Sequence, residues 1–362
     1  MSEERLKLTI YFGERDRAAG RFLADVLLEI FEAHEVGVSV LLRGAEGFGA
    51  KQGLRSDRLL TLSEDLPLVA VAVDAQERIE EALREVEDLS FDGLVTLERA
   101  RLLHASADPP EPPDALDDLG EAAKLTLYMG RGARLDGRNA HAAAVDLLRG
   151  RGIDGASVLL GIDGTLRRSR QRARFFSRNA DVPLMVISVG PTDRVVEAAA
   201  ELARRFADPL MTLERVRVLK RDGSDLADPG VLPEHVEGGM GLWQKLMLYS
   251  SEATHFNGRP VHIEAIRRLR REGAAGATAL RGVWGYHGDH APHGDTFWSL
   301  RRHVPTLTVV VDSPARTRRW LRVLDEVTPE RGLITSEIVP AFRATGPEIS
   351  RGGLRLAARW RW

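Results

Sequence analysis

The stretch KLTIYFG, at residues 7–13, occurs three times in this chain. It returns as KLTLYMG at 124–130 and as KLMLYSS at 245–251. The distance from the tyrosine of each copy to a later glycine is 33 residues every time, from Tyr11 to Gly44, Tyr128 to Gly161 and Tyr249 to Gly282. Self-similarity at a fixed spacing is the signature of tandem structural repeats. The sequence therefore predicts a triplicated unit.

Two later landmarks keep the same register. A proline follows each glycine after 23, 22 and 23 residues, and a glutamate follows the proline after 31, 31 and 32 residues; these are Pro67, Pro183, Pro305, Glu98, Glu214 and Glu337. The acidic, proline-rich segment 105–121 and the glycine- and proline-rich segment 222–241 have the composition of linkers. The predicted division of the chain is repeats at 5–104, 122–221 and 242–345, linkers at 105–121 and 222–241, and a basic tail at 346–362.

Each repeat has the pattern strand, helix, strand, strand, helix, strand. In the first repeat, residues 7–11 alternate polar and apolar side chains, as a half-buried strand does. Apolar residues recur at helical spacing over 22–31, and the charge-rich segment 75–89 is predicted as a second helix. The segments 36–42, 66–73 and 93–103 are rich in strand-forming residues. This order predicts an α+β fold of three tandem ferredoxin-like (βαββαβ) domains. One sheet face and the sheet edges would remain uncovered, and we expect the sister repeats to bury them.

Composition excludes several classes of function. The 362 residues carry a net charge of −2 and include no cysteine. There is thus no overall field to attract nucleic acid, and no disulfide, thiolate nucleophile or cysteine-based zinc site. The charged N-terminus does not resemble a signal peptide, and no apolar run reaches the roughly 20 residues of a membrane-spanning helix. We expect a cytoplasmic protein that does not span a membrane and binds no nucleic acid.

The segment RGAEGFGAK, at 43–51, is a candidate ligand loop because its glycines leave the backbone exposed between two basic residues. Its spacing fits neither a Walker loop nor a dinucleotide fingerprint. Bare amides can still form an anion-binding nest, although a simple turn between strands explains the glycines equally well. The candidate ligand-binding residues of the three copies are Arg43, Gly44, Gly47, Gly49, Lys51, Gly161, Gly164, Arg281, Gly282 and Gly285.

The segments that follow these glycines differ between repeats. The second repeat has RRSRQRAR at 167–174, which suits either a solvated loop tip or contact with phosphate or an acidic partner. The third repeat has WGYHGDHAPHGD at 284–295. Imidazole and carboxylate ligands together suit a divalent metal, and the alternative is a hydrogen-bonded turn. The candidate metal ligands are His287, Asp289, His290 and His293.

All three repeats resemble domain-of-unknown-function family 190, through KLTIYFGERDR, VSVLLRGAEGFG, LSEDLPLVAVAVD and RGVWGYHGDHAPHGD. That family is similar to the PII signalling proteins, which are trimers that bind adenine nucleotides between subunits. The resemblance implies a PII-like fold, a small effector and a loop that contacts a partner. From the triplication we infer an intramolecular pseudo-trimer, either alone or as a dimer of it.

The resulting hypothesis is a non-enzymatic signalling protein. It would bind a small effector, an adenine nucleotide or another anion, in clefts between repeats, and it would contact a partner through the loops after each second strand. Two alternatives remain open: a metal-dependent hydrolase centred on the histidine-rich loop of the third repeat, and a scaffold for a membrane ion transporter or other regulated protein.

Overall fold

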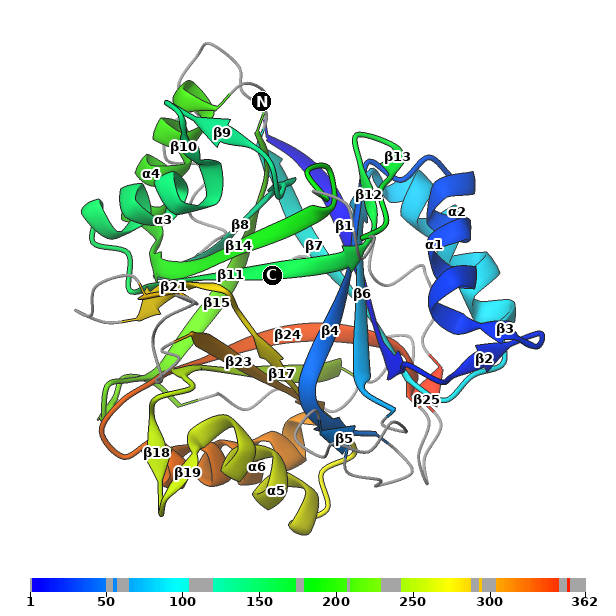
Figure 1. Cartoon of the computed structure of the whole chain (residues 1–362). Coiled ribbons are helices and arrows are strands. Elements are labelled where there is room, and N and C mark those ends of the chain that lie inside the picture. The colour runs from blue at the N-terminus through cyan, green and yellow to red at the C-terminus, as the bar shows by residue number, and fades with distance from the viewer. Residues whose placement is uncertain are drawn as a thin grey trace.

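A computed structural model of the chain describes residues 2–49, 55–56, 65–103, 120–173, 179–206, 209–228, 242–287, 293–294, 304–344 and 350–351. Within these residues the molecule consists of six helices, one large antiparallel sheet and three small sheets of two strands each (Figure 1). None of the helices in this described part is both long enough and apolar enough to cross a membrane.

The main elements follow the same order in each repeat. The first repeat contains β1 (Ser2–Gly13), α1 (Leu23–Ala33), β4 (Val38–Phe48), β6 (Pro67–Asp74), α2 (Gln76–Asp88) and β7 (Leu94–Leu103). The second contains β8 (Ala122–Gly130), α3 (Ala140–Gly150), β11 (Gly155–Asp163), β14 (Pro183–Pro191), α4 (Thr192–Arg205) and β15 (Leu210–Arg221). The third contains β17 (Leu242–Ser251), α5 (Val261–Arg271), β20 (Ala277–Arg281), β21 (Trp284–His287), β23 (Pro305–Asp312), α6 (Pro314–Val327) and β24 (Leu333–Ala344). The short strands are β2 (Arg17–Ala18), β3 (Arg21–Phe22), β5 (Arg55–Ser56), β9 (Arg134–Leu135), β10 (Arg138–Asn139), β12 (Thr165–Leu166), β13 (Ser169–Arg170), β16 (Ser224–Asp225), β18 (His255–Phe256), β19 (Arg259–Pro260), β22 (His293–Gly294) and β25 (Ser350–Arg351).

The four long strands of the first repeat pair in the order β4, β6, β1, β7, and the other two repeats follow the same order. Two helices cover the outer face of each set of four strands, so the six helices lie in three pairs around the sheet (Figure 1). Each pair encloses its own apolar core against the strands. The amphipathic patterns of the sequence specify these three cores.

Hydrogen bonding does not stop at the repeat boundaries. The last strands β7, β15 and β24 pair with one another. The second strands also pair between repeats: β4 pairs with β11 and with β20, and β11 pairs with β21, which follows β20 in the third repeat. A path through β1, β6, β4, β11, β14, β8, β15 and β7 returns to β1 through paired neighbours at every step. The sheet of 19 strands is therefore continuous and closed.

The predicted fold class, three tandem ferredoxin-like domains of the PII-like kind arranged as an intramolecular pseudo-trimer, is wrong. The strands of the three repeats form one closed antiparallel barrel with short helices around it. The physical reason lies in the sheet edges. An unpaired strand edge exposes backbone donors and acceptors, and each repeat satisfies these groups with strands of the others instead of ending as a separate domain.

The inner face of the closed sheet forms a fourth core, to which all three repeats contribute. Lys7, Thr9 and Tyr11 of β1 lie on this face, and their cross-strand neighbours in β7 are Glu98, Thr96 and Leu94. The second repeat pairs the same residue types, while the third has methionine in place of the first-strand threonine. Lys7 and Thr9 are therefore buried, and the sister repeats cover this second face of the sheet as expected.

Candidate functional site

Residues 43–48 of the glycine motif lie within a strand, not in a loop. Strand β4 continues through Gly44 and Gly47 to Phe48 and pairs with β20 of the third repeat. Toward the third repeat, a Cβ atom at Gly44 would lie 3.2 Å from the carbonyl oxygen of Ala279, and one at Gly47 would lie 2.7 Å from the carbonyl oxygen of Ala277. The glycines thus allow the backbones of two repeats to cross at a distance that a side chain would prevent.

The equivalent glycines of the other repeats do the same. Gly164 and Gly285 have φ values of +152° and +150°, and a Cβ atom at either would lie 2.1 Å from a carbonyl oxygen of the neighbouring repeat. These oxygens belong to Ser39 and Ala156. Recurrence of the motif therefore reflects the crossing of second strands, which is a requirement of the closed sheet.

Substitution of Gly47 by alanine is expected to lower the free energy of unfolding by about 1–3 kcal/mol, because the new methyl group overlaps the backbone of β20. Gly49→Ala is the matched control, since a Cβ atom there meets nothing within 4 Å. Urea denaturation followed by circular dichroism measures both. Equal stability of the two variants would contradict the crossing as the reason for the glycines.

A pocket opens beside this crossing, between the first and third repeats. It is a cavity of about 100 Å³. The first repeat contributes Tyr11, Phe12, Gly13, Asp16, Phe48, Gly49, Pro67, Asp92, Gly93 and Leu94, and the third contributes Trp243, Ala275, Gly276, Ala277, Thr278, Val309 and Val311. The pocket is thus assembled only when two repeats, far apart in the sequence, pack together.

The wall of the pocket combines apolar surface with acidic groups. Tyr11, Leu94 and Trp243 are half-buried side chains that also contact the inner core. The charged residues of the wall are Asp16, whose Oδ2 accepts a hydrogen bond of 2.7 Å from the amide of Gly13, and Asp92. No lysine or arginine is among the described residues of the wall.

The position of Gly49 carries a larger side chain at each of the other two crossings. Where the first repeat has Phe48 and then Gly49, the second has Thr165 and Leu166, and the third has Tyr286 and His287. The Thr165 hydroxyl donates to the carbonyl oxygen of Val36 at 3.1 Å. The Tyr286 hydroxyl donates to the carbonyl oxygen of Ile153 at 3.1 Å. At each of these two crossings, a hydroxyl group therefore joins the two repeats by a hydrogen bond.

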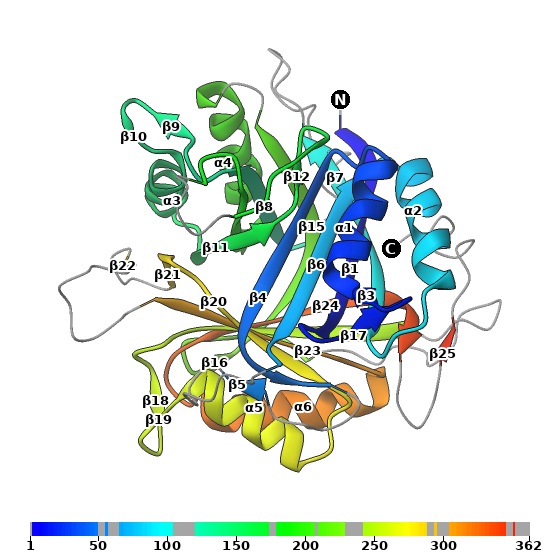
Figure 2. The ribbon, with the colours of Figure 1, turned by 45° about the vertical axis from the view of Figure 1, so that its right-hand side comes forward.

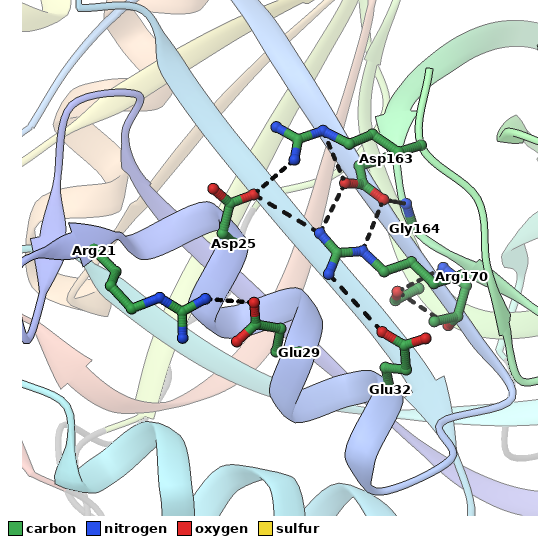
Figure 3. A network of polar contacts seen from close by, with 10 residues as sticks. Arg21, Asp25, Glu29, Glu32, Asp163, Gly164 and Arg170 are labelled. Carbon is green, nitrogen blue, oxygen red and sulfur yellow. Dashed lines mark hydrogen bonds and ion pairs between the residues drawn. The ribbon is translucent and has the colours of Figure 1, made fainter. Parts of the chain in front are cut away.

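The arginine-rich segment of the second repeat docks on helix α1 of the first (Figure 3). Arg170 pairs with the buried carboxylate of Asp163 at 3.0 Å and approaches Asp25 and Glu32 of α1 at 3.8 and 3.9 Å. Arg172 lies 3.1 Å from Asp25. The acidic partner of these arginines is thus part of the same chain.

Six buried charges form a closed ring inside the barrel. Each lysine ammonium lies between two glutamates, one from its own repeat and one from another. The distances from Nζ to Oε2 are 3.3 Å for Lys7–Glu98, 2.7 Å for Lys7–Glu214, 2.9 Å for Lys124–Glu214, 2.5 Å for Lys124–Glu337, 2.8 Å for Lys245–Glu337 and 2.7 Å for Lys245–Glu98. The three lysines and three glutamates balance in charge, and three of the six ion pairs join residues of different repeats: Lys7–Glu214, Lys124–Glu337 and Lys245–Glu98.

Burial and neighbouring charges oppose each other in this ring. Burial favours neutral lysine, but the carboxylates of Glu214 and Glu98 together hold the pKa of Lys7 well above its usual value. Burial likewise favours a neutral carboxyl group, but Lys245 and Lys7 hold the pKa of Glu98 well below its usual value. At Lys124 burial prevails and lowers the pKa. Burial raises the pKa of the adjacent Tyr11 to about 12.

Among the described residues, these glutamates are also the cluster whose geometry could suit a metal, with one oxygen from each lying within 4.8 Å of the others. Their lysine partners already neutralise them. The sequence analysis identifies Glu98, Glu214 and Glu337 only as landmarks of the repeat, and their lysine partners become apparent only in the structure.

Of the predicted ligand residues that the structure describes, one lines the pocket and the others lie at the strand crossings or in ion pairs. Gly49 lines the pocket, whereas Gly44 and Gly47 lie at the crossing beside it. Arg43 pairs with Glu14 at 2.8 Å, and Arg281 pairs with Glu252 at 3.0 Å. The equivalent glycines Gly161, Gly164, Gly282 and Gly285 lie at the other two crossings.

Several predicted residues cannot be placed. Lys51, Asp289 and His290 lie outside the described residues. His287 ends β21 and His293 begins β22, where only the backbone is described. The metal site in the third repeat therefore stays a prediction.

Sequence reasoning missed most of the pocket. Trp243 precedes the repeated KLMLY motif by two residues, where the other repeats have Arg5 and Ala122. Comparison of the three repeats position by position would have found this tryptophan as an unmatched aromatic residue. Asp16 and Asp92 carry no such signal, because acidic residues are common in surface turns.

Comparison with known proteins is consistent with the repeat pattern. The DUF190 family, described as "uncharacterized ACR", matches at residues 5–102, 122–218 and 243–341. A UPF0166 protein of Aquifex aeolicus is 28% identical over 94 residues, which are 26% of this chain and 88% of that protein. A UPF0166 protein of Methanocaldococcus jannaschii is 33% identical over 89 residues, which are 25% of this chain and 82% of that protein. The three predicted copies are confirmed, and the chain belongs to the DUF190 family.

Proposed function

We propose that this chain is a non-enzymatic regulatory protein that binds a small effector in the pocket between its first and third repeats. The observation that carries the proposal is the pocket itself. It lies at the crossing where Gly49 has no side chain to fill the space. The equivalent positions at the other two crossings are Leu166 and His287. A concave site with apolar walls and a few polar groups is the usual form of a small-molecule site.

The wall favours an effector whose inserted part is flat, uncharged or cationic. Tyr11 and Trp243 offer aromatic surface, and the carboxylates of Asp16 and Asp92 accept hydrogen bonds or face positive charge. An anionic group would need a basic partner, and the described wall provides none. Lys51 lies outside the described residues, so the phosphate part of the predicted nucleotide stays a prediction.

Binding at this position would link effector concentration to the stability of the whole molecule. Both walls of the pocket exist only while the first and third repeats are packed together. A ligand that binds only this folded arrangement stabilises it by mass action, by about 2.7 kcal/mol at a concentration 100 times its Kd.

A thermal-shift screen of the purified chain tests the proposal. The probes are nucleosides, nucleotides, aromatic amines, inorganic phosphate and divalent metal chlorides. We expect at least one probe of the first three kinds to raise the melting temperature. Ala275→Trp should abolish the shift because Ala275 lies on the wall of the pocket. Ala142→Trp on the outer helix α3 is the control and should retain it.

Two outcomes would overturn the proposal. One is the absence of any shift across the whole panel. The other is a shift that survives Ala275→Trp unchanged, which would place binding elsewhere in the chain.

A further inference from the structure

The three helix pairs have the same scaffold but very different charges. Helix α1 has three acidic residues, and α2 has six acidic and two basic residues, so this pair has a net charge of −7. Helices α3 and α4 are each neutral. Helices α5 and α6 have eight arginines and three acidic residues, so this pair has a net charge of +5. The overall charge of −2 conceals this separation.

The acidic pair already binds arginine within the molecule. Arg170 and Arg172 of the second repeat reach Asp25 at the N-terminal end of α1 (Figure 3). The exposed carboxylates of α2 lie beyond this contact, at Glu77, Glu81, Glu85, Glu87 and Asp88. An array of this kind suits the planar fork of the arginine guanidinium group.

The basic pair presents several of its arginines to solvent. Arg267, Arg271 and Arg322 are exposed and make no hydrogen bond or ion pair to any residue in the described part of the chain. A shallow groove between α5 and α6 is lined by Arg268, Arg271, Arg319 and Arg322, together with Glu272 and Glu326. Arg268 already pairs with Glu264 and Glu326, and Arg319 with Glu272, so Arg271 and Arg322 are the guanidinium groups of this groove that face incoming carboxylates.

The two charged pairs lie on different sides of the molecule, α1 and α2 beside β1 and β6, and α5 and α6 below β23 (Figure 2). They do not meet within one chain. We infer that a second copy of this chain is the partner, with α1 and α2 of one molecule docked against α5 and α6 of the other. The two surfaces differ, so the contact is heterologous, and repetition of it gives a ring or an open chain.

Electrostatics determines how this association behaves. Exposed ion pairs contribute about 0.2–1 kcal/mol each and are screened by salt, so the interface depends on several acting together. Complementary charged patches also raise the rate of encounter. This inference is independent of the effector pocket, because no residue of either helix pair lines that pocket.

Sedimentation velocity of the wild-type chain provides the first test. The monomer has a mass of 40.0 kDa. At a fixed protein concentration, we expect a weight-average mass above this value at about 20 mM salt and a return to monomer at about 500 mM salt. A chain that remains monomeric at low salt overturns the inference.

A charge exchange identifies the surfaces. Arg267→Glu with Arg271→Glu and Arg322→Glu changes the basic pair from +5 to −1, and Glu77→Arg with Glu81→Arg and Glu87→Arg changes the acidic pair from −7 to −1. Each triple variant alone should be monomeric at low salt. An equimolar mixture should associate, because it again combines one −7 surface with one +5 surface.

The matched control is Arg204→Glu on the neutral helix α4, which should associate as the wild type does. Association of either triple variant alone, or a mixture that stays monomeric, shows that these helices do not form the interface and overturns the inference.

Discussion

Replacement of Lys245 by methionine is expected to lower the free energy of unfolding by about 3–5 kcal/mol, the usual cost of removing one partner from a buried ion pair. The Lys245 ammonium lies 2.7 Å from Glu98 and 2.8 Å from Glu337. Burial opposes its charge, but these two carboxylates together raise its pKa. Methionine preserves the apolar stem and leaves two buried carboxylates with one lysine each. Urea denaturation followed by circular dichroism measures the loss.

A double variant separates the charge from the packing. Removal of Glu337 together with Lys245, as Lys245→Met with Glu337→Leu, leaves two lysines and two glutamates that still pair. It should therefore be more stable than Lys245→Met alone. The control is Arg138→Met, which breaks an exposed pair with Asp146 and should cost less than about 1 kcal/mol. A loss at Lys245 no greater than that of the control would show that the ring is not a stabilising bridge between repeats.

The repeat structure and the helices could be predicted from the sequence because they depend on local patterns. Apolar residues at helical spacing identify the segment that forms α1, and the tyrosine and glycine landmarks identify the three copies. Both signals lie within one repeat and need no knowledge of what packs against it.

The closed sheet could not be predicted in this way, because its cause lies between repeats. Alternation of Lys7, Leu8, Thr9 and Ile10 predicts a strand with one polar face, but it does not show which groups of the other repeats meet that face once it is buried. The polar face is tolerated inside because each lysine meets glutamates from two repeats, which are 91 and 207 residues away for Lys7. No local pattern contains such a partner.

The candidate site was predictable only in part for the same reason. Gly49 belongs to the glycine motif and does line the pocket. Trp243 and Thr278 come from the third repeat, and their approach to Gly49 follows from the pairing of β4 with β20. The end of β4 was also predicted too early, at residue 42, because Gly44 and Gly47 are poor strand formers. Close backbone crossing explains why glycine is present in this strand.

The extension of β4 past its glycines has a second consequence. It places Phe48, a residue of the first repeat, in the core under α5 and α6 of the third. Tyr286 of the third repeat occupies the equivalent place in the core of the second. The second repeat has the smaller Thr165 at this position, and it makes hydrogen bonds to the first repeat instead. Large aromatic side chains thus anchor two of the three crossings.

Phe48→Ala is therefore expected to lower the free energy of unfolding by about 3–5 kcal/mol, as truncation of a buried aromatic residue does. The side chain is 4% exposed and packs with residues of the third repeat such as Ala277. Phe22→Ala is the control, because that ring is 45% exposed and contacts Arg17, so its loss should cost about 1 kcal/mol or less. If the two variants are equally stable in urea, Phe48 does not anchor the third repeat. A large loss at Phe48 alone would show that one repeat completes the core of another, which is the reason these three units cannot be separate domains.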